Sequence, residues 1–304
     1  MFSKIVKSTT FLLFAATTLS AANFNAGAEK DRLEMIKYFE AKFEDPAKNL
    51  NRFFPYSDEE ELATKYDKGL KHMDFNIGSY AYSKDAKFQY EQLKEMPPYD
   101  YAIDKGEELY TKKFANGNSL QTCFPDLTNA GTYPYFDEKS KKMVSLTSTI
   151  NDCLRANGEK EWDTKKGPLA EFQAYWVNES KEAGKIFDIK INSQAEKDAY
   201  ERGKEYYYTQ RGYLKLSCAT CHVQGAGQRV RNEILSPLVG QVTHFPVLRL
   251  KWTDIGTVER RLSGCVVDQG QVPPKDESQT MIELLYFLAY MSNGMPVDGP
   301  DVRK

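Results

Sequence analysis

Two cysteines and a histidine stand at a spacing that can attach a porphyrin to the chain. Cys218-Ala219-Thr220-Cys221-His222 has the form C-x-x-C-H, the attachment signature of c-type haem. In such a site the two thiols add across the two vinyl groups, and the adjacent imidazole becomes the proximal iron ligand. The alternatives are a redox dithiol or half of a zinc site, but zinc needs further ligands at short spacing, and the chain has only 3 histidines. The motif predicts one covalently bound haem c.

Such a haem has a sixth coordination position, and three later residues could occupy it. Met295 would make a high-potential electron carrier, unless it simply fills a gap in the core. Cys265 would bind as a thiolate, a stronger donor that lowers the potential. His244, or no protein ligand at all, is the third possibility. Cys265 is favoured because burial against a metal protects an unpaired thiol in an oxidising compartment, while the other two remain open.

An arginine near Cys265 points to anion chemistry. If the local segment is helical, Arg261 lies four positions before Cys265 on the same face. A guanidinium there favours the thiolate over the thiol and offers a forked site for a small oxyanion. Arg261 could instead form a surface ion pair with Glu259 or Asp268, and Arg260 would compete for the role if the helix is irregular.

The cysteine count suggests a disulfide. Of the 5 cysteines, two belong to the haem motif, which leaves Cys123, Cys153 and Cys265. Cys123 and Cys153 are the favoured pair, and a bridge between them would stabilise the fold by about 3–4 kcal/mol in the chain-entropy estimate. Two unrelated buried thiols, or a pairing with Cys265, are the alternatives.

The elements that must position these residues follow an internal repeat. Gly203-Lys-Glu-Tyr-Tyr207 precedes Cys221, and Gly106-Glu-Glu-Leu-Tyr110 precedes Cys123 at nearly the same distance. Both stretches are typical of the N-terminal helix, carrying an aromatic residue, that packs against haem in c-type domains. Phe124 stands in the first copy where His222 stands in the second. The first copy is therefore expected to lack a haem.

The second halves of the two copies also correspond. Amphipathic stretches follow Cys153 and Cys265, at Leu169–Trp176 and Met281–Met291, and the latter shows apolar residues on one helical face. The predicted fold is mainly α, with two tandem cytochrome c-like domains, at 99–195 without haem and at 196–304 with haem.

A helical N-terminal extension, residues 23–98, is expected to pack on the first domain. Its helix-like stretches are Arg32–Phe43 and Asp58–His72. The charge runs in this region are typical of solvated helix faces.

The start of the chain and its composition indicate an exported protein. Basic residues, a short apolar run and a small-residue cleavage site predict a signal peptide over residues 1–22, with an uncleaved anchor as the alternative. Haem c is attached outside the cytoplasm, so the periplasm is expected. Net charge is −2 for the full chain and mean hydropathy is −0.60, so the composition predicts no nucleic-acid partner, and no later segment is apolar enough for a membrane span.

Taken together, these motifs resemble the SoxA family of sulfur-oxidation c-type cytochromes, the catalytic subunits of SoxAX. The likeness covers nearly all of the chain after the signal peptide. It rests on the haem motif followed by three further segments: His244-Phe245-Pro246, Glu259–Cys265 with its R-x-x-x-C pattern, and Asn293-Gly294. The tail, Gly299–Lys304, departs from the family's usual Pro-Gly-Arg-rich end, which puts the tail contacts in doubt.

The resemblance implies a function and a set of roles. Such a protein is an L-cysteine S-thiosulfotransferase that joins thiosulfate to a cysteine of the carrier SoxYZ, with release of two electrons, in a heterodimer with the haem protein SoxX. His222 would be the proximal ligand, Cys265 the distal ligand and the bearer of a catalytic persulfide, and Arg261 the substrate-binding cation. The monohaem branch carries a disulfide in its first domain. The main alternative is a periplasmic electron-transfer cytochrome with His/Met ligation and no catalysis of its own.

Overall fold

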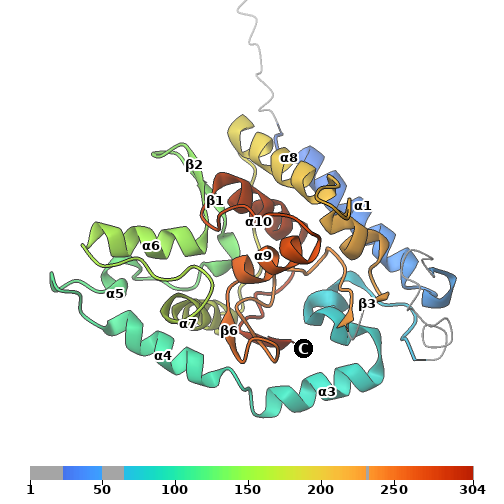
Figure 1. Ribbon diagram of the computed structural model, residues 1–304, viewed down its shortest axis with the longest axis horizontal. Coiled ribbons are helices and arrows are strands. Elements are labelled where there is room, and N and C mark those ends of the chain that lie inside the picture. Colours follow the sequence, from blue (N-terminus) through green and yellow to red (C-terminus); the bar gives the residue numbers. More distant parts are fainter. Residues whose placement is uncertain (1–22, 50–64, 231–232, 304) are drawn as a thin grey trace, which may run out of the picture.

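The computed structural model describes residues 23–49, 65–230 and 233–303, and the expected signal peptide lies outside these residues. The described part is mainly α, as predicted, with a few short strands among the helices (Figure 1). None of the helices described there is long and apolar enough to cross a membrane.

The first domain is built on two crossed helices. Its elements are α4 (Asp100–Thr111), α5 (Leu120–Cys123), the 3₁₀ turn η3 (Ala130–Thr132), β1 (Tyr135–Asp137), β2 (Lys142–Val144), α6 (Leu146–Ala156) and α7 (Pro168–Glu182). A disulfide joins Cys123 to Cys153, linking α5 to α6. Phe124 packs against Trp176 of α7, with ring centroids 4.6 Å apart. Aromatic side chains and a disulfide thus occupy the interior of this domain.

The second domain repeats this pattern. Its elements are α8 (Gln194–Tyr208), the π-helical turn η4 (Thr220–Gln224), β3 (Arg229–Val230), β4 (Glu233–Ile234), β5 (Val247–Arg249), β6 (Asp254–Gly256), α9 (Val258–Asp268), α10 (Gln279–Met291) and β7 (Asp301–Arg303). Helix α10 was expected to bury one face, but every residue from Met281 to Met291 is buried. It contacts α8, α1 and β2, so it packs inside the molecule rather than on its surface.

Hydroxyl side chains set the starts of the principal helices. Ser193, Thr257 and Ser278 precede α8, α9 and α10, and each accepts a hydrogen bond from the backbone N–H three residues on, at 3.2–3.4 Å. Ser145 does the same before α6, at 3.1 Å. Such caps satisfy amide groups that the first helical turn leaves without partners. They place α9, which carries Arg261 and Cys265, in a defined register.

The N-terminal extension differs from its expectation in two respects. It contains α1 (Ala26–Lys42), the 3₁₀ segments η1 (Pro46–Asn49) and η2 (His72–Tyr82), and α3 (Lys84–Glu95). The predicted helix at Asp58–His72 is wrong over 65–71, which form turns and bends, while 58–64 lie outside the described residues. Second, α1 lies along α8 of the second domain, where Asp31 contacts Lys204 at 2.5 Å (Figure 1).

Further contacts tie the extension to the haem-motif domain rather than to the first domain. The buried Lys42 ammonium donates to the carbonyl oxygens of Val223 and Gln224, at 3.1 and 2.8 Å, just after the C-x-x-C-H motif. Phe43 and Tyr66 of the extension also contact the chain just after the motif: a Cβ atom at Gly227 would stand 2.7 Å from Phe43 Cε1, and the Tyr66 hydroxyl donates to the Gly227 carbonyl oxygen at 3.0 Å.

A small sheet brings the C-terminus to the centre of the molecule. Strand β5 lies between β6 (antiparallel) and β7 (parallel), with Arg249 opposite Arg303 in the β5–β7 register. Asp301 is fully buried. The tail whose contacts were in doubt is thus part of the interior (Figure 1).

Candidate haem centre

The C-x-x-C-H motif lies in a tight helical turn after α8. Ser217 and Thr220 cap each other's backbone N–H groups, each at 3.1 Å, which fixes the start of the turn. Cys218 and Cys221 are three positions apart and neither is in a disulfide. This spacing places the two thiols on one face of the turn with His222 beside them.

The His222 imidazole is oriented for metal binding. Its Nδ1 lies 2.8 Å from the carbonyl oxygen of Ser236, and because a carbonyl can only accept, Nδ1 carries the proton. Nε2 is left as the basic nitrogen. Burial lowers the pKa of His222 to about 4, so the ring is neutral at neutral pH, the form that binds metals.

His222 and Cys265 line the same cavity, although they lie on different elements. This cavity measures about 390 Å³ and is also lined by Cys221. Leu216, Val230 and Leu235 form the apolar part of its wall. Its size lies within the ~300–1,000 Å³ of common ligand pockets. An attachment thiol, a neutral imidazole and a further thiol around an apolar space fit a c-type haem, so the residues present suit that cofactor.

Arg261 lines this cavity. The segment is helical, so Arg261 and Cys265 share one face of α9, and both line the cavity. The negative charge of a Cys265 thiolate raises the pKa of Arg261 more than burial lowers it. Arg261 Nη2 also lies 3.5 Å from Glu233 Oε2. The neighbouring Arg260 instead stacks on Trp252, 4.3 Å from the ring centroid, so the competing assignment is not supported.

Met295, the candidate for a methionine-ligated haem, lies elsewhere. It is 1% exposed and packs in the core, and its backbone oxygen accepts from the N–H of Phe187 at 2.9 Å. It lines neither cavity that contains His222. Its role is that of a core residue.

The zinc alternative needs a cluster of ligands around the motif. Within 23–49, 65–230 and 233–303, no group of three or more His, Cys, Asp or Glu side chains gathers in a way that could hold a metal ion.

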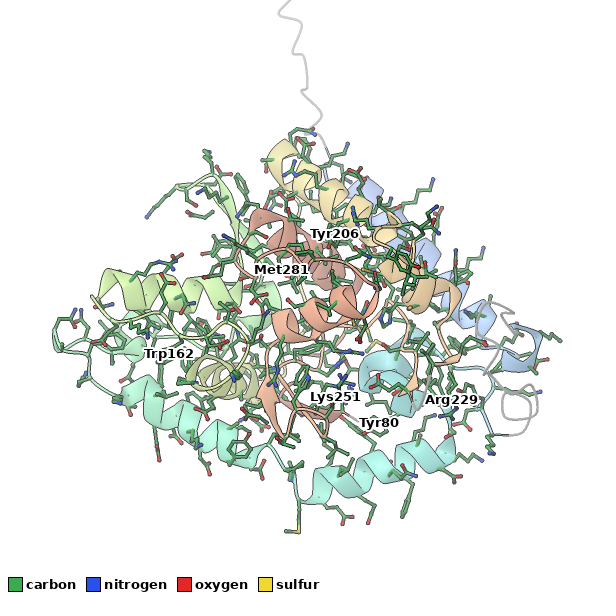
Figure 2. The ribbon with its side chains drawn as sticks, viewed as in Figure 1. Tyr80, Trp162, Tyr206, Arg229, Lys251 and Met281 are labelled. Carbon is green, nitrogen blue, oxygen red and sulfur yellow. A yellow bond between two sulfur atoms is a disulfide. The ribbon has the colours of Figure 1, made fainter. Side chains whose placement is uncertain are left out.

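A second cavity adjoins the first, and some of the residues that line it, such as Arg249 and Arg303, were not predicted from the sequence. It measures about 310 Å³ and shares His222, Glu233, Arg249 and Arg261 with the first. Tyr80, Arg229, His244 and Arg303 also line it, and Tyr80 and Arg229, which Figure 2 labels, come from separate segments of the chain. His244, a candidate iron ligand, lines this cavity and not the one with Cys265. No local signal marks Arg249 or Arg303, because strand pairing alone brings them together.

Comparisons with known proteins agree with this geometry. A family model described as the SoxA/TsdA cytochrome c domain matches residues 105–184 and 202–297, the two repeats. The L-cysteine S-thiosulfotransferase subunit SoxA of Chlorobaculum tepidum is 44% identical over 236 residues, which cover 77% of this chain and 82% of the relative. Its counterpart from Allochromatium vinosum is 38% identical, covering 76% and 83%. The crystal structure of SoxXA from P. pantotrophus is similar with a TM-score of 0.66 at 28% identity, covering 73% of this chain and 87% of that one.

Proposed function

Because this chain belongs to the SoxA family of c-type cytochromes, we propose that it is the catalytic subunit of an L-cysteine S-thiosulfotransferase. It conjugates thiosulfate to a cysteine of a sulfur carrier protein. An S–S bond forms between the carrier sulfur and thiosulfate, the thiol proton leaves, and two electrons pass to cytochrome acceptors. The observation that carries this proposal is the shared cavity of His222, Arg261 and Cys265.

Cys218 and Cys221 would hold one haem c through thioether bonds, and His222 and Cys265 would bind its iron. When bound, the haem supplies a centre that accepts one electron at a time. The Ser236 carbonyl holds His222 in the tautomer that leaves Nε2 free for iron. The disulfide between Cys123 and Cys153 belongs to the first domain, so a single haem is expected.

Cys265 would carry the sulfur chemistry, as a persulfide with one additional sulfur atom. Arg261, one helical turn away, would hold the sulfonate end of thiosulfate through its forked N–H donors. Glu233 keeps the guanidinium at the cavity wall. Thiosulfate would then lie beside the sulfur of Cys265, where the carrier cysteine can approach, and as the S–S bond forms the carrier thiol loses its proton and two electrons pass to the cytochrome acceptors.

The partners follow from the same family assignment. A SoxX-type cytochrome would form a heterodimer with this subunit and supply the second one-electron centre, and a SoxYZ-type carrier would present the acceptor cysteine. The similarity to a chain of the SoxXA crystal structure supports the first of these partners. The periplasm is the expected compartment, because c-type haem is attached there.

Replacing Cys265 by Ser tests the proposal directly. The variant should keep its covalent haem but release no electrons when thiosulfate and carrier protein are added. Intact mass should show one haem and one extra sulfur in the wild type, and the extra sulfur should be absent from the variant. Val267→Ala, at an exposed position on the same helix, is the control and should turn over normally.

Thiosulfate-dependent electron release by the Cys265→Ser variant would contradict this assignment. A near-infrared methionine–iron band in the oxidised wild type would instead support the electron-carrier alternative.

A further inference from the structure

The chain that follows the haem-motif turn leads to the hydrogen-bond acceptor of His222. It forms the antiparallel strand pair β3–β4 and then reaches Ser236, whose carbonyl oxygen lies 2.8 Å from His222 Nδ1. At the base of this strand pair the Gly227 N–H donates to the Leu235 carbonyl oxygen at 2.8 Å, and the Leu235 N–H donates to the Gln228 carbonyl oxygen at 2.9 Å. Leu235 directly precedes Ser236, so the base of the strand pair sets where the Ser236 carbonyl lies.

Two stacked tyrosines of the N-terminal extension bind this base. Tyr66 donates its hydroxyl to the Gly227 carbonyl oxygen at 3.0 Å, and Tyr82 donates to the Leu235 carbonyl oxygen at 2.9 Å. The two ring centroids lie 5.4 Å apart, with an angle of 8° between the ring planes. The Asp67 N–H donates to the Tyr82 carbonyl oxygen at 2.7 Å, which ties the two tyrosine segments together. The tyrosines therefore hold both arms of the strand pair.

Both tyrosines are enclosed by the protein. Tyr82 is fully buried and packs against Phe43, with ring centroids 5.1 Å apart, and Tyr66 is 7% exposed. Burial raises the pKa of Tyr82 well above its usual value, so its hydroxyl keeps the proton that it donates. A hydrogen bond in such surroundings is costly to lose, because a buried polar group without a partner is not solvated.

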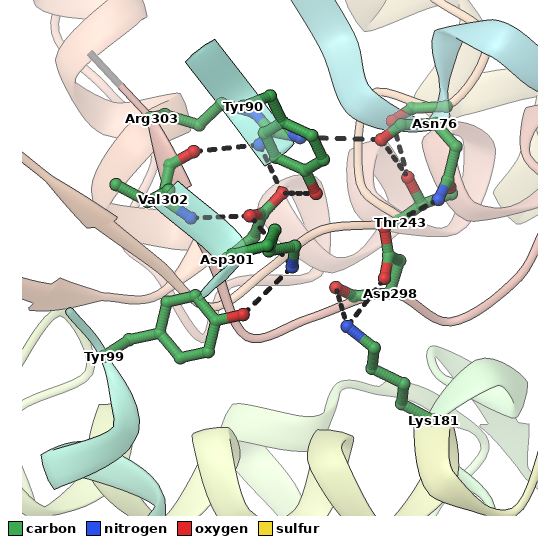
Figure 3. Close-up of polar contacts among 11 residues, drawn as sticks. Asn76, Tyr90, Tyr99, Lys181, Thr243, Asp298, Asp301, Val302 and Arg303 are labelled. Atoms are coloured by element: carbon green, nitrogen blue, oxygen red, sulfur yellow. Dashed lines mark hydrogen bonds and ion pairs between the residues drawn. The ribbon is translucent and has the colours of Figure 1, made fainter. Parts of the chain in front are cut away.

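The segment that carries Tyr82 is anchored by contacts outside the strand pair (Figure 3). Tyr82 is the last residue of η2, and within η2 the Asn76 side-chain amide donates to Asp298 at 2.9 Å. Asp298 also pairs with Lys181 of the first domain at 2.8 Å. The Thr243 hydroxyl donates to the Asn76 carbonyl oxygen at 3.4 Å. Because η2 is fixed to both domains, Tyr82 can hold the strand pair in place instead of following it.

We propose that Tyr66 and Tyr82 are positioning residues for His222. By holding the base of the β3–β4 pair they fix the Ser236 carbonyl, and that carbonyl keeps the proton on His222 Nδ1 and leaves Nε2 free. Neither tyrosine lines the cavity that contains Cys265, so their effect passes through the loop. The inference rests on the proposed function, because it takes His222 as the iron ligand of a c-type haem.

The hydrogen bond to Ser236 has an expected effect on the haem iron. An Nδ1–H group that donates to a carbonyl makes the opposite ring nitrogen a stronger donor, and a stronger donor favours the oxidised iron. If the base of the strand pair loosens, the Ser236 carbonyl moves away from Nδ1 and His222 becomes a weaker ligand. The midpoint potential should therefore rise when either tyrosine hydroxyl is removed.

The test is a redox titration of purified haem-loaded protein, with absorbance reporting haem content. Tyr66→Phe and Tyr82→Phe each remove one oxygen atom and no charge, so a shift in midpoint potential cannot come from a lost charge. Loss of an outer-shell partner costs ~10–100-fold in metal affinity, so the double variant should weaken the binding of His222 to ferric relative to ferrous iron by about tenfold, which corresponds to a rise of about 59 mV. Each single variant should give a smaller rise, and the single variants decide if the double variant attaches no haem.

Tyr110→Phe is the matched control, because Tyr110 is also buried and donates its hydroxyl to a backbone carbonyl, that of Phe124 in the first domain, at 2.8 Å. It should lower the stability to denaturant as much as the single variants do, but leave the midpoint potential unchanged. If haem-loaded Tyr66→Phe and Tyr82→Phe keep the wild-type potential, or if Tyr110→Phe shifts as much as they do, the positioning role is wrong. Absence of haem from the wild-type protein would overturn the proposed function itself.

Discussion

At the scale of single residues, the site depends on groups whose neighbours set their chemical form. The Ser236 carbonyl makes His222 a metal-binding tautomer, and Glu233 holds Arg261 against the cavity. The roles of the Ser236 carbonyl and of Glu233 were not predicted from the sequence. They act through hydrogen bonds and charge across loops, which carry no pattern in the sequence.

Arg261→Ala should weaken thiosulfate use while leaving the haem in place. Hydrogen bonds to charged groups contribute ~1.5–3 kcal/mol, so the thiosulfate concentration for half-maximal rate should rise about 10- to 100-fold. Steady-state kinetics with carrier protein in excess would measure this. The control is Arg260→Ala, which removes the arginine stacked on Trp252 and should change this concentration much less. Equal effects of the two substitutions would mean that Arg261 has a structural role and does not bind thiosulfate.

At the scale of elements, each domain is held by one close helix crossing. Gly106 of α4 meets α7, and Gly203 of α8 meets α10. A Cβ atom at Gly106 would stand 2.3 Å from the backbone oxygen of Glu171, and one at Gly203 would stand 2.0 Å from that of Glu283. The faint repeat read from the sequence therefore has a physical basis, since both copies need a residue without a side chain at the crossing.

Gly106→Ala and Gly203→Ala should each destabilise the protein. The added methyl group meets backbone that cannot rotate away, and overpacking of this kind costs about 1–3 kcal/mol in the free energy of unfolding. Chemical denaturation would measure the loss. Gly27→Ala in α1, where a Cβ meets nothing within 4 Å, is the control and should leave stability unchanged or slightly raised. Tolerance of alanine at both crossings would mean that the helices separate readily.

At the scale of the whole molecule, the two domains enclose a third cavity at their interface. It measures about 80 Å³, and its wall includes Tyr133 and Leu146 from the first domain and Val258 and Leu285 from the second. Glu259 lines it, is 1% exposed, and its Oε2 has no partner among the described residues. Burial raises the pKa of Glu259 to about 7, with the charge of Asp276 adding to the effect.

This carboxyl group should make the stability of the molecule depend on pH. Between pH 4.5, its ordinary pKa, and about 7, folded Glu259 keeps a proton that the unfolded chain has released, so its contribution to stability is lost as pH rises. The shift corresponds to about 3 kcal/mol. Relative to the wild type, Glu259→Gln should therefore gain stability from pH 5 to pH 8, as denaturant unfolding would show. A constant difference across this range would mean that Glu259 is ionised throughout, and Glu182→Gln at an exposed site should give such a constant difference.

The sequence by itself determined what depends on short spacing. The C-x-x-C-H turn, the shared face of Arg261 and Cys265 on α9, the helices α7 and α10 and the mainly α fold were all predicted, because helical periodicity places near neighbours without reference to the rest of the chain. The tertiary structure alone decided that Cys265 rather than Met295 faces the cavity with His222, that the N-terminal extension covers the second domain, and that Arg249 lies beside Arg303. Those outcomes depend on packing between segments far apart in sequence, and many pairings of such segments would bury similar apolar area, so local pattern cannot select among them.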